Sequence, residues 1–140
     1  MTRVITYGTF DLFHYGHLEL LRRAKGLGDY LMVAVSTDAF TTVEKGKDCT
    51  RPYIERAAIV AANKYVDVVI PEVSWEQKPG DVKNHDIDIF VIGDDWSGKF
   101  DEQLCKLCKV IYLPRTNGIS TSDIKKTIVR KGLDKKELHA

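Results

Sequence analysis

Residues 30–36 form a nearly continuous apolar run, YLMVAVS, which limits the possible folds more than any other stretch of the chain. A strand that is apolar on both faces needs cover on both sides, and the helices packed on a parallel sheet give that cover. Parallel strands also need long crossover connections, usually helices. The run therefore predicts an α/β fold with a parallel sheet.

Strand-like and helix-like segments alternate along the rest of the chain. Four further strands are predicted over residues 3–7, 67–70, 87–92 and 109–113, and Pro71 is expected to stop the strand over residues 67–70. Helices are predicted to begin near residues 15, 52 and 120. Weaker helical patterns cover residues 74–85, interrupted at Pro79-Gly80, and residues 102–107. The alternation predicts a single doubly wound, Rossmann-like, five-stranded parallel sheet with helices on both faces.

Apolar residues at helical spacing mark the helix faces that we expect to be buried. In the helix that begins near residue 15 they are Leu20, Ala24 and Leu27. In the next helix they are Ile54, Ala58, Ala61 and Tyr65. Residues 37–51 have no such periodicity, so we expect a loop there, and a loop of this length is usually functional.

Composition places the chain among ordinary globular proteins. Its 140 residues suffice for one domain, which we expect over residues 1–130, with residues 131–140 as a charged tail that frays. The net charge of +1 gives no reason to expect nucleic acid or an anionic membrane as a partner. The three cysteines, Cys49, Cys105 and Cys108, suit a reducing cytoplasm better than a disulfide scaffold.

Chemically unusual residues follow four of the five predicted strands. In doubly wound sheets, ligands bind beyond the carboxyl ends of the strands, where the strand order reverses. The residues in question lie in the segments 9–17, 45–47, 94–96 and 115–121. The sequence therefore predicts that four separate connections meet at one crevice.

The first of these segments contains His14, Gly16 and His17 at the expected start of a helix. Backbone N–H groups and the positive dipole end make a helix start an anion site, and imidazoles there can donate hydrogen bonds to phosphate. Gly16 leaves room for a phosphate, and Thr9 can donate its hydroxyl. Two alternatives are a surface histidine pair beside a helix cap and a zinc site, although zinc would lack a third ligand.

Two motifs resemble those of a known enzyme family. Residues 8–11 (GTFD), followed by His14-x-Gly16-His17, resemble the signature of the nucleotidyltransferase superfamily that contains the cytidylyltransferases. Residues 115–122 (RTNGISTS) resemble that family's second signature, with Ser122 where threonine is usual. Residues 93–96 (GDDW) and the short chain are most similar to cytidylyltransferases that act on glycerol 3-phosphate. The resemblance covers the chain to about Arg130.

The resemblance implies transfer of the cytidylyl group of CTP to sn-glycerol 3-phosphate, which gives CDP-glycerol and pyrophosphate. The acceptor phosphate would attack the α-phosphorus in line, with Mg²⁺ on the triphosphate and Asp11 as a candidate contact for the metal or the substrate. The product would serve a teichoic-acid-like or capsular polymer. The resemblance also implies a homodimer.

Site residues are carried over position by position. The candidate catalytic residues are His14, His17, Lys47 and Arg115. The candidate CTP-binding residues are Thr9, Phe10, Asp11, His14, Gly16, His17, Asp95, Arg115, Thr116, Ile119, Ser120 and Thr121. The candidate acceptor-binding residues are Asp11, Lys45, Arg56, Lys64, Trp75 and Lys78.

Several of these assignments have alternatives. Either Lys45 or Lys47 would neutralise the triphosphate. Lys64 replaces an arginine usual in the family, and lysine lacks the planar fork that binds phosphate through two bonds. Phosphoethanolamine and phosphocholine are alternative acceptors, and a regulatory module that binds nucleotide without turnover is an alternative of another class. Cys105 and Cys108 form a CxxC pair that we expect to serve packing.

Overall fold

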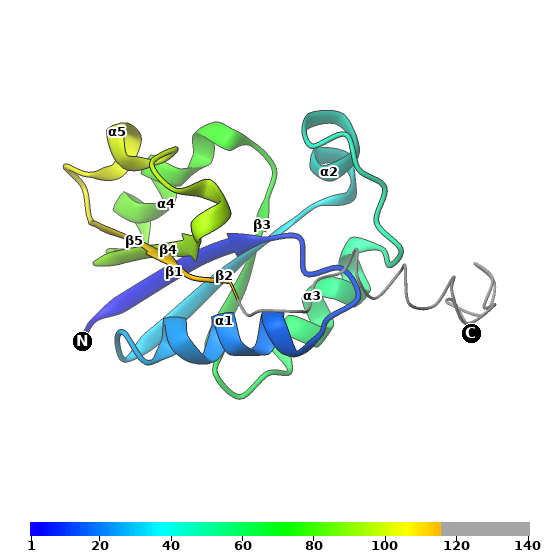
Figure 1. The fold of residues 1–140 in the computed structure, drawn as a ribbon, viewed down its shortest axis with the longest axis horizontal. Coiled ribbons are helices and arrows are strands. Elements are labelled where there is room, and N and C mark those ends of the chain that lie inside the picture. The colour runs from blue at the N-terminus through cyan, green and yellow to red at the C-terminus, as the bar shows by residue number, and fades with distance from the viewer. Residues whose placement is uncertain (116–140) are drawn as a thin grey trace.

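The computed structural model describes residues 1–115, and these form a five-stranded, wholly parallel sheet with strand order β3-β2-β1-β4-β5 (Figure 1). The strands are β1 (Arg3–Gly8), β2 (Tyr30–Ser36), β3 (Val68–Glu72), β4 (Ile89–Gly93) and β5 (Lys109–Leu113). The order reverses between β1 and β4, which lie side by side at the centre. The predicted fold class is confirmed.

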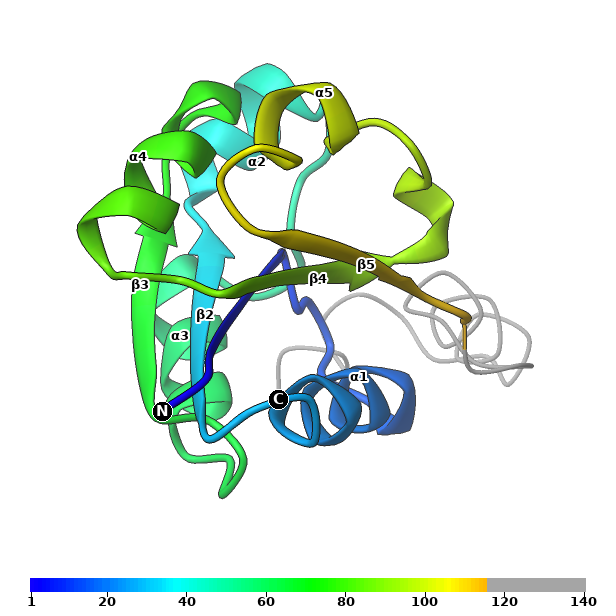
Figure 2. The same ribbon diagram turned by 90° about the vertical axis from the view of Figure 1, so that its left-hand side faces the viewer.

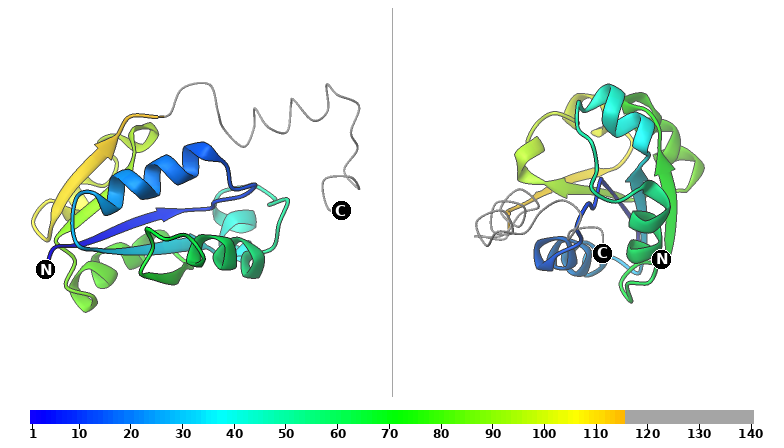
Figure 3. Two further views of the ribbon diagram at one scale, coloured as in Figure 1. Left: turned by 90° about the horizontal axis from the view of Figure 1, so that it is seen from below. Right: turned by 90° about the vertical axis from the view of Figure 1, so that its right-hand side faces the viewer.

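The helices cover the sheet on both faces (Figures 2 and 3). The helices are α1 (Tyr15–Lys25), α2 (Asp38–Glu44), α3 (Tyr53–Ala61), η1 (Trp75–Gln77), α4 (Lys78–Asn84), η2 (Asp94–Trp96) and α5 (Asp101–Leu104). Leu21 of α1 and Val60 of α3 join the core on one face, whereas Val82 of α4 and Leu104 of α5 join the core on the other. The helix α2 lies beyond the carboxyl end of β2 (Figure 1).

The loop expected over residues 37–51 contains α2, so that prediction was wrong for its first half. The Thr37 hydroxyl caps this helix by accepting a hydrogen bond from the Phe40 N–H at 3.2 Å. Phe40 and Thr41 are buried. The helix has only seven residues, too few to show a helical period, and its stability comes from the cap and from packing.

The face of α3 expected to be buried is instead exposed. Ile54 is 76% exposed, and Ala58 and Ala61 are exposed with it. Tyr65, the fourth residue of the expected face, lies beyond the end of α3 and is partly buried against the core. The residues that face the sheet are Tyr53, Arg56 and Val60. Arginine is rarely buried unless its N–H groups are paired, so the sequence favoured the apolar stripe over this face.

Three further boundaries differ from expectation, two of them for clear backbone reasons. Pro71 lies inside β3 instead of ending it, since β3 is an edge strand, where a missing N–H costs no ladder hydrogen bond. Pro79 occupies the first turn of α4, where a missing N–H is also harmless, so α4 continues through Gly80. The helix α5 is shorter than the predicted segment 102–107 and ends at Leu104.

Candidate active site

A cleft of about 550 Å³ opens at the carboxyl ends of β1 and β4, where the strand order reverses. It is lined by Tyr7, Gly8, Thr9, Phe10, Asp11, His17, Leu20, Thr41, Lys47, Asp48, Cys49, Ile92, Gly93, Asp95 and Trp96. A pocket of about 190 Å³ adjoins it and shares the wall formed by Thr9, Lys47 and Trp96. The site thus has two compartments of unequal size.

The connection from β1 to α1 has an unusual backbone path. Phe10 and Leu12 adopt positive φ angles of 55° and 49°, which side-chain-bearing residues rarely do. A Cβ atom at Gly8 would lie 2.8 Å from the Phe10 ring, so only glycine fits before this turn. As a result, the centroid of the Phe10 ring lies 5.4 Å from that of the His17 ring, and this contact joins the turn to the first turn of α1.

His14 and His17 form a reciprocal cap on the first turn of α1. His14 Nδ1 accepts from the Gly16 N–H at 3.0 Å, and His17 Nδ1 accepts from the His14 N–H at 3.1 Å. Their rings stack with centroids 3.8 Å apart. The N–H of Gly16, expected to face a phosphate, is therefore used by an imidazole, as in a capping box.

This cap sets the protonation state of both imidazoles. Because each Nδ1 accepts a hydrogen bond, each ring carries its proton on Nε2. Burial lowers the pKa of His17 to about 3, with a smaller contribution from His14. Burial and the nearby Arg115 charge lower the pKa of His14. At neutral pH the pair thus offers two neutral Nε2–H donors, and His17 lines the cleft.

The cap predicts a pH dependence of stability. In the folded chain the pKa of His17 lies below its ordinary value of 6.5, so the unfolded chain takes up the proton first as pH falls. The contribution of His17 is full above pH 6.5 and declines below it, by about 1.4 kcal/mol per pH unit. Urea unfolding at pH 7, 6, 5.5 and 5 should show this slope. The slope of the unfolding free energy against pH should be smaller in His17→Asn. An unchanged slope in that variant would show that His17 is not the group responsible.

The two candidate lysines occupy different environments. Lys45 Nζ donates to Ser36 Oγ at 2.9 Å and to Thr9 Oγ1 at 3.3 Å, and it pairs with Glu72 at 3.6 Å. Burial lowers the pKa of Lys45. Lys47 is exposed and lines both the cleft and the pocket. The geometry therefore favours Lys47 as the cation for a triphosphate and leaves Lys45 in the pocket wall.

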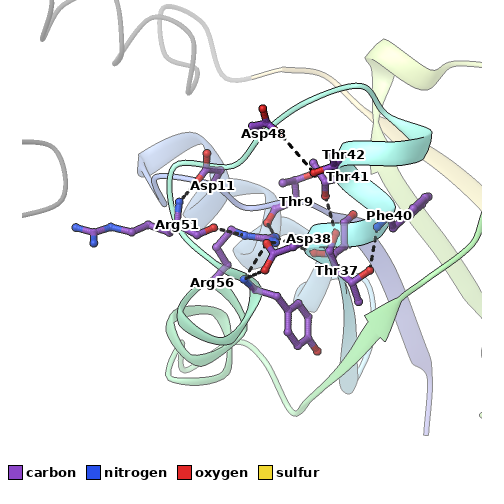
Figure 4. Close-up of polar contacts among 12 residues, drawn as sticks. Thr9, Asp11, Thr37, Asp38, Phe40, Thr41, Thr42, Asp48, Arg51 and Arg56 are labelled. Carbon is purple, nitrogen blue, oxygen red and sulfur yellow. Dashed lines mark hydrogen bonds and ion pairs between the residues drawn. The ribbon is translucent and has the colours of Figure 1, made fainter. Parts of the chain in front are cut away.

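Arg56 is only 1% exposed and joins three connections at the carboxyl edge of the sheet (Figure 4). Its Nη1 donates to the carbonyl oxygens of Thr9 at 2.7 Å and Ser36 at 2.9 Å, and its Nε donates to that of Arg51 at 2.9 Å. Its Nη2 pairs with Asp38 at 2.9 Å. These bonds use four of the five guanidinium N–H groups. Arg56 lines neither compartment, so the acceptor contact proposed for it has no support from the geometry.

Asp11 anchors the segment that follows α2. Its Oδ2 accepts from the Thr50 N–H at 2.7 Å, and its Oδ1 accepts from the Arg51 N–H at 3.0 Å (Figure 4 shows the latter). The carboxylate is buried but lines the cleft. Within residues 1–115, no group of three or more His, Cys, Asp or Glu side chains is placed to hold a metal ion.

The remaining predicted side chains fall in three places. Asp95 lines the cleft, and Trp75, Lys45 and Lys78 line the pocket. Arg115, the last residue that the structure describes, is exposed, and its charge lowers the pKa of His14. Thr116, Ile119, Ser120 and Thr121, the last predicted helix and the tail lie outside the described residues.

Lys64 lies far from both compartments in this chain. It is exposed and follows the end of α3, near the edge at which β3 begins. Its ammonium lies 5.2 Å from the Tyr65 ring centroid. The carboxyl ends of the strands, and so the cleft, are at the opposite edge. The structure does not bring Lys64 together with the other acceptor candidates.

Sequence reasoning missed Tyr7 and Glu72, which line the pocket, and Ser36, which hydrogen-bonds Glu72 and Lys45 behind it. Ser36 and Glu72 end β2 and β3, and Tyr7 lies near the end of β1. Glu72 is 1% exposed, and its Oε1 accepts from Ser36 Oγ at 2.7 Å. The rule that ligands bind beyond the carboxyl ends of strands would have pointed to Ser36 and Glu72, since both are polar residues at strand ends.

Comparison with known proteins agrees with this geometry. The model of the cytidylyltransferase-like family matches residues 5–127. A glycerol-3-phosphate cytidylyltransferase from Bacillus spizizenii is 60% identical over 90% of this chain and 96% of its own length. The enzyme of that name from Staphylococcus aureus is 54% identical over 94% of this chain and 98% of its own length.

A solved structure shares the fold. The lipopolysaccharide core biosynthesis protein from Thermoplasma volcanium superposes with a TM-score of 0.73 and 28% identity, over 84% of this chain and 99% of that one. The sheet order, the histidine cap and these similarities agree with one another. The chain therefore belongs to the cytidylyltransferase-like family of nucleotidyltransferases and, within it, to the family of the glycerol-3-phosphate cytidylyltransferases.

Proposed function

We propose that this enzyme transfers the cytidylyl group of CTP to sn-glycerol 3-phosphate. The observation that carries the proposal is a two-compartment site at the strand switch point, with the neutral His17 donor in the larger compartment, its capping partner His14 beside it, and lysines in the smaller compartment. The cleft of about 550 Å³ suits a nucleotide. The pocket of about 190 Å³ suits a small phosphorylated alcohol.

The chemistry is a single displacement at the α-phosphorus. An oxygen of the acceptor phosphate forms the new P–O bond as the bond to pyrophosphate breaks, and pyrophosphate leaves with the electron pair. Nε2–H groups of His14 and His17 would donate to phosphoryl oxygens as their charge redistributes. Lys47 would neutralise the departing oxygens, and Lys45 would lie near the acceptor phosphate. Positioning and charge stabilisation supply the rate enhancement.

A divalent cation, proposed as Mg²⁺, would arrive with the triphosphate. Mg²⁺ in nucleotide sites is commonly held by one or two carboxylates together with substrate phosphates. Asp11 and Asp95 line the cleft and fit that donor set. The ion would supply charge neutralisation of the triphosphate.

The test is incubation of the purified protein with CTP, Mg²⁺ and glycerol 3-phosphate across pH 6–9. We expect pyrophosphate release that depends on the acceptor, with CDP-glycerol formed in equal amount. Absence of pyrophosphate release throughout this range would refute the proposal. Calorimetric CTP binding without turnover of any phosphorylated acceptor would instead favour a regulatory module.

Lys47→Met is predicted to lower kcat/KM for CTP by about tenfold to a hundredfold, because the variant removes an exposed cation from the cleft without breaking an ion pair among residues 1–115. Thermal unfolding should be unchanged. Lys106→Met, which removes an exposed lysine elsewhere, is the matched control. Equal kinetics in both variants would remove Lys47 from the site.

We also propose that the enzyme is a homodimer that uses the exposed apolar face of α3. Ile54 is 76% exposed, and Ala58 and Ala61 lie on the same face of the helix and are exposed too. A second copy would bury this stripe. Sedimentation should give twice the chain mass for the wild type and the chain mass for Ile54→Asp. Val73→Asp, at another exposed apolar residue, should stay dimeric. A wild-type monomer, or a dimeric Ile54→Asp, would contradict this.

A cytoplasmic location is part of the proposal. Cys49, Cys105 and Cys108 are all free thiols, as a reducing compartment favours. Cys108 packs against the core as expected, whereas Cys105 is exposed. Within residues 1–115, none of the helices has both the length and the apolar character needed to cross a bilayer.

A further inference from the structure

The ammonium of Lys78 is enclosed by three aromatic rings. Lys78 is 1% exposed, and its Nζ lies 4.6 Å from the Tyr7 ring centroid, 4.8 Å from that of Phe100 and 5.3 Å from that of Trp75. All three distances are within the range of a cation–π interaction. These rings and Lys78 form part of the wall of the smaller pocket, where the acceptor is proposed to bind. We refer to Tyr7, Trp75 and Phe100 as the aromatic cage.

A carboxylate completes the cage. Glu72 Oε2 accepts from Lys78 Nζ at 3.0 Å, and both side chains are almost fully buried. Glu72 Oε1 accepts from Ser36 Oγ at 2.7 Å and pairs with Lys45 at 3.6 Å. Both carboxylate oxygens are thus engaged, and the buried ion pair has the additional hydrogen bond that such pairs need.

Neighbouring side chains hold the cage in place. The Tyr7 hydroxyl donates to Asp81 Oδ2 at 2.6 Å. Gln77 Nε2 donates to the same oxygen at 2.9 Å and to the Pro71 carbonyl at 3.0 Å. Trp75 meets the Phe40 ring edge-on at 5.0 Å. The cage is therefore a built structure and not a chance approach of exposed rings.

Three rings and a carboxylate are the recognition chemistry for a quaternary or primary ammonium group. In this enzyme the protein supplies the ammonium itself. A phosphorylated alcohol with a cationic end would meet the Lys78 charge and find the rings and Glu72 already engaged. An uncharged polyol can instead bind the Lys78 charge, with a hydroxyl that accepts from one of the ammonium N–H groups that Glu72 does not use.

We propose that Lys78 determines the specificity for the acceptor. Its ammonium group occupies the aromatic cage, so the pocket binds phosphorylated polyols and rejects acceptors that carry an ammonium group of their own. The proposal rests on the proposed function and names what selects its acceptor. It is an example of specificity through a repulsive element placed against competitors.

Lys78→Met is the test, since Met is close to lysine in length and lacks the charge. We expect the ratio of kcat/KM for phosphocholine to that for glycerol 3-phosphate to rise by about 100-fold, because the ammonium group of phosphocholine can take the place of the lost Lys78 ammonium in the cage. Lys83→Met, at an exposed position of the same helix, should keep the wild-type ratio. A ratio in Lys78→Met equal to that of the wild type would overturn the proposal.

A second variant covers the case in which Lys78→Met leaves Glu72 unpaired and unfolds. Glu72→Gln/Lys78→Met removes both charges and should fold. Its ratio should rise by at least about tenfold, since the rings alone still bind a cation. An unchanged ratio in this folded double variant would equally overturn the proposal.

A binding readout separates this proposal from the proposed function. Tetramethylammonium chloride is titrated against each folded variant, and the fluorescence of Trp75 in the cage and of its neighbour Trp96 is followed. Saturable quenching is expected in the variants without Lys78 and not in the wild type. Equal responses in all proteins would refute the cage assignment, whatever the enzyme's turnover. Absence of wild-type turnover with glycerol 3-phosphate would count only against the proposed function.

Discussion

His14→Asn and His17→Asn should each lower kcat by about 10²–10³-fold while leaving the fold intact. Asparagine places its side-chain oxygen where the imidazole Nδ1 lies, so the hydrogen bond from the Gly16 or His14 N–H survives. The Nε2–H donor is lost in both variants. The substitution therefore separates the capping role of each histidine from its role toward phosphate.

Stopped assays with CTP and glycerol 3-phosphate measure kcat, and thermal unfolding measures stability. His14→Ala and His17→Ala should lose turnover as well, together with about 1 kcal/mol of stability from the lost cap. His85→Asn is the matched control, since His85 ends α4 away from the cleft. Near-normal turnover in both Asn variants would show that the two imidazoles serve only as caps.

Arg56→Met should lower the free energy of unfolding by about 3–5 kcal/mol, since each buried carbonyl left without a donor costs about 1–3 kcal/mol. The variant leaves the carbonyl oxygens of Thr9, Ser36 and Arg51 without their donor and Asp38 without its ion pair. Methionine fills a similar length without replacing a hydrogen bond. Denaturant unfolding at pH 7 measures the loss.

The same variant distinguishes two roles for Arg56. If Arg56 only joins the three connections, the folded fraction of Arg56→Met should keep a KM for glycerol 3-phosphate close to that of the wild type. If Arg56 binds the acceptor phosphate, as the sequence suggested, KM should rise at unchanged stability. Arg22→Met, which removes an exposed ion pair with Glu19, is the control and should unfold at the same denaturant concentration as the wild type.

The sheet could be predicted from sequence because its signal is local. The run over residues 30–36 and the segment 109–113 match β2 and β5 to the residue. The predicted boundaries were wrong where the position of a strand in the sheet mattered more than its local sequence. Pro71 is tolerated only because β3 is an edge strand, and strand order is not a property of one segment.

The prediction of the buried face of α3 was wrong for a different reason. A stripe of Ile54, Ala58 and Ala61 has the spacing of a core face whether it meets its own sheet or a second chain. Burial of Arg56 depends on carbonyl oxygens of the nearby Arg51 and of the distant Thr9 and Ser36, which no helical period reveals. Periodicity marks an apolar face without showing whether that face packs against the sheet of its own chain.

The site could be located from sequence more fully than it could be understood. His14, His17, Lys47 and Asp95 follow strand ends, and the structure brings them to the cleft or its rim. Their states depend on contacts that the sequence does not show. The neutral form of the histidines comes from the reciprocal cap, and the engaged state of Lys45 and Lys78 comes from Glu72, which the sequence reasoning overlooked.

The most direct test of the central claim is a competition between acceptors. Glycerol 3-phosphate, phosphoethanolamine and phosphocholine are mixed at equal concentration with CTP, Mg²⁺ and the wild-type enzyme, and the products are resolved by mass. We expect CDP-glycerol to dominate, with one pyrophosphate for each CDP-glycerol formed. CDP-ethanolamine or CDP-choline as the main product, or the absence of any CDP-alcohol, would contradict the account.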